Sequence, residues 1–201
     1  MILLDYPRLD HMSGGKLNYG ATSAGREFKK DLSPLGLKEN INYKFDYIYP
    51  EIPEPDKMSR KGDKVLTYKE PKAAVVYEHL GTLLEHITAY QPDLLIPVNS
   101  IGSKLLTGSK IVKAQGVPVE GTLEHGDLKY SCWVLPMFSQ EFVNSKPTNK
   151  ITRDLSISLL NKYLDEGETV FQPERPNYHE LTTLQQVKQA FALPKVTGEF
   201  A

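Results

Sequence analysis

The chain has little of what a metal-dependent or disulfide-linked protein needs. Cys132 is the one cysteine among 201 residues, which excludes an intramolecular disulfide, a cysteine-rich zinc site and a four-cysteine iron–sulfur cluster. We interpret Cys132 as an unreactive strand residue beside Trp133 rather than as a nucleophile. The five histidines form no His-x3-His pair and no cluster. We therefore expect no metal and no cofactor.

Long apolar runs and an excess of charge are also missing. No stretch approaches the ~18 apolar residues of a membrane span, and the apolar start of the chain is too short for a signal peptide. Lys and Arg number 24 and Asp and Glu 25, so the net charge is -1. This balance excludes a polycationic coat for nucleic acid but allows a local basic cleft. We expect a soluble cytoplasmic protein with no membrane partner.

Apolar strands alternate with amphipathic helices along the chain. We predict strands at 2–4, 42–49, 94–98 and 130–136, an extended segment at 111–119, and helices at 24–35, 73–90, 100–106 and 151–164. The last helix has Leu155, Leu159 and Tyr163 on one stripe. The continuous apolar run 94–98 is typical of a central parallel strand covered on both faces. This alternation predicts an α/β fold.

The character of the chain changes after Gly167. A proline-rich stretch at 171–178 is followed by a predicted short helix at 181–191, and the last residues resemble the start of a strand. We therefore expect one domain over 1–167. Residues 168–201 would hold a linker, a helix and the beginning of a further domain.

Three predicted strands end in polar loops. These loops contain Asp5 and Tyr6, then Asn99 and Ser100, and finally residues 137–140. Ligands of open α/β sheets bind beyond the carboxyl ends of the strands, so we expect the loops to converge on one site. Two interpretations of Asp5 remain open, a cap for a helix or loop and a carboxylate that orients a water molecule.

Basic residues lie in two segments. Asn99 and Ser100 open a helix that contains Lys104, and the free N–H groups at that start would suit an anion unless the side chains simply cap the helix. Neither the Gly-x4-Gly-Lys-Ser/Thr nor the Gly-x-Gly-x-x-Gly pattern is present. Residues 57–72 hold six basic residues against two acids, which fits a solvated loop or a rim that contacts phosphate.

Several segments together resemble the uracil-DNA glycosylase superfamily. Residues 91–108, with Pro92-Asp93 before the apolar strand and a small-residue helix that ends at Gly108, resemble its middle motif. Residues 3–7 resemble its first motif and residues 134–140 its last. The segments at 144–147 and 153–155 resemble those found after the last motif in family members. The resemblance covers residues 1 to 165 and depends on the order and spacing of the motifs.

The resemblance implies a three-layer α/β/α fold with a central, mostly parallel sheet. Members flip a deoxyuridine out of DNA and cleave its glycosidic bond. By position, Asp5 would take the acidic role, Ser100 would stand where some members read uracil with Asn, and Tyr6 and Tyr19 would line the base pocket. Ser139 replaces a histidine that stabilises the uracil anion, which typically costs ~3 kcal/mol of transition-state stabilisation. The four cluster-binding cysteines of the family's iron–sulfur members are also absent. Together these departures from the family's pattern imply a degenerate site.

A second resemblance concerns the context of the domain. Similar domains precede the exonuclease of some bacteriophage family A DNA polymerases, and residues 196–201 would lead into such an exonuclease. We therefore expect an accessory domain that binds DNA or docks replication proteins, in the host cytoplasm. The residues expected to contact DNA are Arg60, Lys61, Lys64, Asn99, Lys104, Lys110, Lys113 and Gln140. The alternatives are an active glycosylase that uses Asp5 and a pure protein-interaction module.

Overall fold

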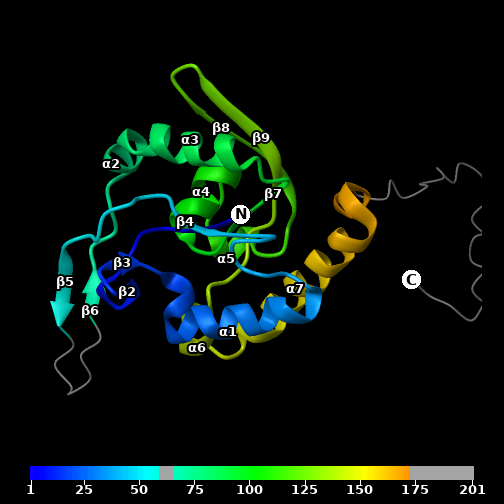
Figure 1. Cartoon of the computed structure of the whole chain (residues 1–201), viewed down its shortest axis with the longest axis horizontal. Coiled ribbons are helices and arrows are strands. Elements are labelled where there is room, and N and C mark those ends of the chain that lie inside the picture. Colours follow the sequence, from blue (N-terminus) through cyan, green and yellow to red (C-terminus); the bar gives the residue numbers. More distant parts are fainter. Residues whose placement is uncertain (59–65, 173–201) are drawn as a thin grey trace, which may run out of the picture. The chain divides into compact units, whose positions relative to one another are not determined.

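A five-stranded sheet organises the chain. The computed structural model describes residues 1–58 and 66–172. The strands lie side by side in the order β4 (Phe45–Tyr47), β1 (Ile2–Leu4), β7 (Leu94–Pro97), β9 (Leu128–Val134) and β8 (Val119–His125). The first four strands are parallel, and β8 pairs antiparallel with β9 at the edge. The α/β fold with a mostly parallel sheet is thus confirmed (Figure 1).

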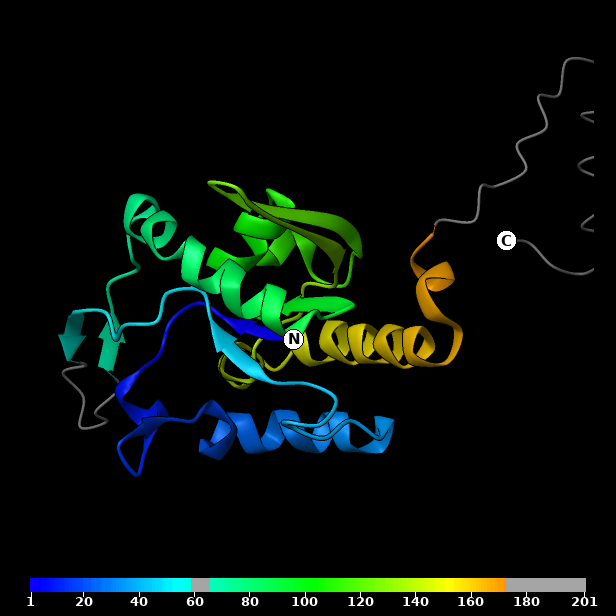
Figure 2. The ribbon, with the colours of Figure 1, turned by 45° about the horizontal axis from the view of Figure 1, so that its top comes forward.

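Helices pack on both faces of this sheet, because its central strands are apolar on both sides (Figure 2). Ile2 and Leu4 of β1 join a cluster with α1 (Ser23–Leu32) and α7 (Asn149–Glu166). Leu3, which points the other way, joins a cluster with α2 (Ala73–Glu78), α3 (Leu80–Tyr90) and α4 (Ser100–Thr107). The period of two along β1 therefore divides the core between the two faces.

Shorter elements complete the described part of the chain. Two hairpins are formed by β2 (Met12–Ser13) with β3 (Lys16–Leu17) and by β5 (Pro55–Met58) with β6 (Leu66–Tyr68). The remaining helices are α5 (Ile111–Ala114), α6 (Gln140–Ser145) and the 3-10 turns η1 (Leu9–His11), η2 (Tyr19–Ala21), η3 (Ser33–Leu35) and η4 (Gly167–Phe171). Across residues 1–58 and 66–172, every helix is too short or too polar to cross a membrane.

The end of this unit is fixed by an aromatic contact. Phe171 is buried, and its ring stacks on Tyr163 at 4.7 Å and lies 5.2 Å from Trp133. The compact unit therefore extends from Met1 to Phe171, past the boundary predicted at residue 167. The helix predicted at 181–191 and the strand start at 196–201 lie outside the described residues.

Some local predictions were wrong. The segment 111–119 is not extended, because it forms α5 and only its last residue enters β8. The helix predicted at 73–90 is interrupted at His79, whose ring packs edge-on against Tyr49 at 5.0 Å. The predicted stripe on α7 is wrong at one position: Leu159 and Tyr163 pack against the core, but Leu155 is 66% exposed. Arg153 of the same helix is 1% exposed.

Candidate functional site

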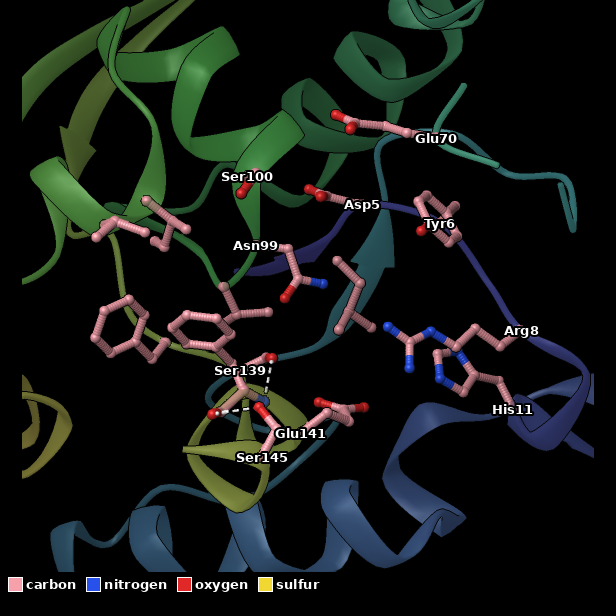
Figure 3. Close-up of a pocket in the computed structure, with 16 residues that line it drawn as sticks. Asp5, Tyr6, Arg8, His11, Glu70, Asn99, Ser100, Ser139, Glu141 and Ser145 are labelled. Atoms are coloured by element: carbon pink, nitrogen blue, oxygen red, sulfur yellow. Dashed lines mark hydrogen bonds between the residues drawn. The ribbon is translucent and has the colours of Figure 1, made fainter. Parts of the chain in front are cut away.

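A cavity of about 380 Å³ opens at the carboxyl ends of the parallel strands (Figure 3). Asp5 follows β1, Asn99 follows β7, and Ser139 follows the extended segment after β9, so three distant loops meet here. The expected convergence is therefore confirmed. The lining consists of Leu4, Asp5, Tyr6, Arg8, His11, Glu70, Val98, Asn99, Ser100, Ile111, Val112, Phe138, Ser139, Glu141, Phe142 and Ser145.

Asp5 caps helix α4 with both carboxylate oxygens. They accept hydrogen bonds from the backbone N–H groups of Ile101 and Gly102, each at 2.9 Å. Burial raises the pKa of Asp5 to about 6, although these hydrogen bonds oppose the shift. The anion expected at the start of α4 is thus supplied by the chain itself, and the capping interpretation of Asp5 is the one the contacts support.

Close approach of α4 to the sheet depends on Gly102. A Cβ atom at this position would lie 2.5 Å from Cδ1 of Ile48 and 3.0 Å from Cβ of Pro97. Without a side chain, the first turn of α4 comes close enough for its N–H groups to reach Asp5. The sequence Asn99-Ser100-Ile101-Gly102 therefore positions one wall of the cavity.

Ser139 caps a second helix at the same edge. Its side chain is 4% exposed, and its Oγ accepts a hydrogen bond from the backbone N–H of Phe142 at 3.3 Å. Ser139 is thus the N-cap of α6, whose first turns also supply Glu141 and Phe142 to the cavity. Asn99, by contrast, makes no side-chain capping bond on α4, and its amide points into the hollow (Figure 3).

Tyr19 and Gln140 are predicted site residues that lie away from the cavity lining. Tyr19 is 2% exposed and packs edge-on against Phe45 at 5.0 Å. Its hydroxyl donates a hydrogen bond to Oε2 of Glu141 at 3.2 Å, so it supports a wall of the cavity from behind. Gln140 contacts Arg153 and Asn144 and lies beside a different hollow.

His11 is a buried residue of the site to which sequence reasoning gave no role. It is 3% exposed, its Nδ1 lies 3.0 Å from the hydroxyl of Tyr47, and the two rings stack at 5.8 Å. Its Nε2 is buried without a hydrogen-bond partner among the described residues. Burial lowers the pKa of His11, so the neutral imidazole is favoured. One indication of a role in the site was present in the sequence, namely that His11 lies in the segment that follows β1.

Sequence reasoning also missed three charged residues. Arg8, Glu70 and Glu141 all line the cavity. Among the side chains that the structure describes, Arg8 has no ion-pair partner within 4.0 Å. Figure 3 shows its guanidinium and the carboxylate of Glu141 directed into the same hollow from different elements. Arg8 and Glu70 lie in loops and Glu141 lies in the first turn of α6, and at such positions the sequence pattern does not predict where a side chain points.

The predicted basic residues divide into three groups. Lys104 and Lys110 line a second, more apolar hollow of about 700 Å³ that shares Ser100 and Glu70 with the first cavity. Lys113 is exposed on α5. Arg60, Lys61 and Lys64 lie outside the described residues.

Comparison with known proteins adds no relative. No model of a known protein family matches the chain, and a search of curated proteins finds no match either. Within the described residues, no group of three His, Cys, Asp or Glu side chains could hold a metal ion. The arrangement of the cavity and of the basic residues beside it is therefore the guide to function.

Proposed function

We propose that the chain is a uracil-DNA-glycosylase-like α/β/α domain that holds DNA as an accessory part of a phage-type DNA polymerase. The observation that carries the proposal is the convergence of Asp5, Ser100 and Ser139 on one cavity. These residues belong to the three segments that resemble the family's motifs, in the family's order. They follow neighbouring parallel strands, as a base-binding site in such a sheet requires.

The contacts of the two residues at catalytic positions support a role in binding rather than in hydrolysis. Both oxygens of Asp5 are engaged by backbone N–H groups of α4. Oγ of Ser139 accepts a hydrogen bond as the cap of α6, so the residue can offer an anion only one neutral O–H group. A residue that orients water or stabilises a leaving anion needs a free polar atom beside the reacting group. The engaged oxygens of Asp5 and the neutral hydroxyl of Ser139 at the histidine position therefore argue against efficient catalysis.

The distribution of charge supports contact with a phosphate backbone beside the cavity. No acidic residue occurs between Leu94 and Val119, whereas Lys104, Lys110 and Lys113 lie in that segment. Two of these lysines line the hollow that adjoins the base-sized cavity. A base in the cavity would leave its phosphates outside, where ammonium groups can replace condensed counterions.

Binding of a fluorescent oligonucleotide, measured against salt concentration, tests this proposal. The wild-type chain should bind at low salt, and the double variant Lys104→Met/Lys110→Met should lower the slope of log affinity against log salt by about 2. Lys162→Met on α7 changes the charge by one on another helix and serves as the control. No affinity at low salt, or an unchanged slope in the double variant, contradicts DNA binding at this surface.

The same preparations separate the active-enzyme alternative. The chain is incubated with uracil-containing single- and double-stranded DNA, and released base is measured for the wild type and for Asp5→Asn. We expect no turnover above background. Turnover that disappears in Asp5→Asn would identify a working glycosylase and overturn the degenerate-site part of the proposal.

A further inference from the structure

Two opposite charges enter the cavity without pairing with each other. Arg8 comes from the loop after β1, and Glu141 comes from the first turn of α6. No ion pair within 4.0 Å joins them. An arginine and a glutamate that share a hollow but remain apart leave room for a ligand between them. That ligand must offer hydrogen-bond acceptors to the guanidinium and donors to the carboxylate.

Glu141 is held in place for such a contact. The hydroxyl of Tyr19, a residue that is 2% exposed, donates to Oε2 of Glu141 at 3.2 Å. Oε1 and the remaining lone pairs stay available for a ligand. Asp5 is less available, because each of its oxygens already accepts a backbone hydrogen bond. Glu70, the third acid of the lining, is exposed to solvent. Glu141 is therefore the acidic group best prepared to receive a donor.

The walls of the cavity suit a flat, weakly polar face. Phe138 and Phe142 lie at 4.8 Å between ring centroids, and Val98 and Ile111 also line the hollow. Phe142 remains 37% exposed, so part of its ring is free to contact a ligand. Aromatic and aliphatic side chains of this kind hold an unstacked base by its faces. The ligand thus has apolar faces and a polar edge.

We infer that the cavity binds an unpaired guanine base of a DNA strand, read by Glu141 and Arg8. Guanine is the DNA base with two adjacent donors, N1–H and N2–H2, which one carboxylate can accept together. Its O6 and N7 are the paired acceptors that an arginine fork binds. Uracil and thymine present one N–H between two carbonyl oxygens, which a carboxylate repels. The inference rests on the proposed function, because it names the base that the DNA-holding cavity takes.

The test uses single-stranded oligothymidine probes that carry one central dG, dA, dC or dU. Affinity is measured by fluorescence anisotropy at one fixed low salt concentration. The dG probe should bind about tenfold more tightly than the others, the discrimination expected of one good bidentate contact. Glu141→Gln keeps an acceptor for Tyr19 but removes the charge, and it should reduce this preference to less than twofold. Glu120→Gln, the same change at an exposed position on β8, should leave the preference intact.

Two guanine analogues test the contacts of Glu141 and Arg8 separately. Inosine lacks the N2 amino group, so its loss of affinity should be large in the wild type and small in Glu141→Gln. 7-Deazaguanine lacks N7, so its loss should be large in the wild type and small in Arg8→Lys, which keeps the charge without the fork.

The outcomes distinguish this inference from the proposal it rests on. Equal binding of the four probes, or a preference for dU, overturns guanine recognition while DNA binding stands. Failure of every probe to bind refutes the proposed function itself and the inference with it.

Discussion

The buried carboxylate of Asp5 should make stability depend on pH in a direction opposite to that of most aspartates. Its side chain is 7% exposed, and burial raises its pKa from 3.8 to about 6. The folded state therefore keeps a proton that the unfolded state releases between these values. The resulting stabilisation is complete below pH 3.8, decreases as pH rises through 6, and is absent at neutral pH. A shift of about two pH units corresponds to ~3 kcal/mol at most.

Urea unfolding of the wild type and of Asp5→Asn at pH 5 and pH 7 measures this effect. The wild type should gain ~1.4 kcal/mol relative to the variant on going from pH 7 to pH 5, because ionisation of a group with a pKa near 6 costs about this much per pH unit. Asparagine keeps one acceptor for the N–H groups of α4. Loss of the other capping bond lowers the free energy of unfolding of the variant by ~1 kcal/mol at pH 5 and at pH 7 alike. It therefore does not affect the comparison.

The contribution of Asp5 is isolated only by the difference in unfolding free energy between the wild type and Asp5→Asn. Burial lowers the pKa of the Met1 amino group to about 5, and burial also lowers the pKa of His11. Both groups favour folding as pH rises, which opposes the effect of Asp5. Asp127→Asn, at an exposed hairpin turn, controls for the general loss of one negative charge. A wild-type-to-Asp5→Asn difference that is the same at both pH values would refute the argument from burial. A difference that changes in the opposite sense would mean that the start of α4 outweighs desolvation.

Two further substitutions test the packing around the site. Asp31→Asn removes the ionic partner of Arg153, which is 1% exposed and bonded to Asp31 at 2.6 Å. Urea unfolding should show that the free energy of unfolding falls by ~2 kcal/mol. This is less than for a fully buried pair, because Asp31 is 42% exposed. Asp154→Asn, in an exposed i,i+4 pair, should cost ~0.5 kcal/mol or less, and equal losses would contradict a special role for the buried arginine. Gly25→Ala would place a Cβ atom against the carbonyl oxygen of Tyr19, so the backbone would have to move. We expect the free energy of unfolding to fall by more than ~2 kcal/mol, measured by thermal or urea unfolding. A variant as stable as the wild type would contradict this contact.

Local pattern was sufficient for the elements that form the framework of the site. The apolar runs at 2–4 and 94–97 are strands, because only a covered central strand buries every residue in succession. The helix after Asn99 ends at Gly108 in the left-handed conformation, as the glycine predicts. The rule that ligands bind beyond the carboxyl ends of parallel strands was enough to place Asp5, Ser100 and Ser139 together.

The chemical roles of these residues could not be derived in the same way. Capping by Asp5 joins it to Ile101 and Gly102 across 96 and 97 positions of the chain. A sequence shows that such a carboxylate follows a strand, but it does not show which distant N–H groups the carboxylate meets. Tyr19 was placed in the base pocket, and in the structure its ring is instead packed in the core behind Glu141.

The sequence alone thus determined the class of fold and the edge of the sheet at which the loops meet, because hydrophobic period and the order of strands and helices along the chain can be read from the residues. Tertiary structure decided which side chains enter the hollow. Arg8 and Glu141 face one cavity, Arg153 is buried, and Leu155 of the predicted apolar stripe is exposed, because packing between distant segments fixes the direction of each side chain.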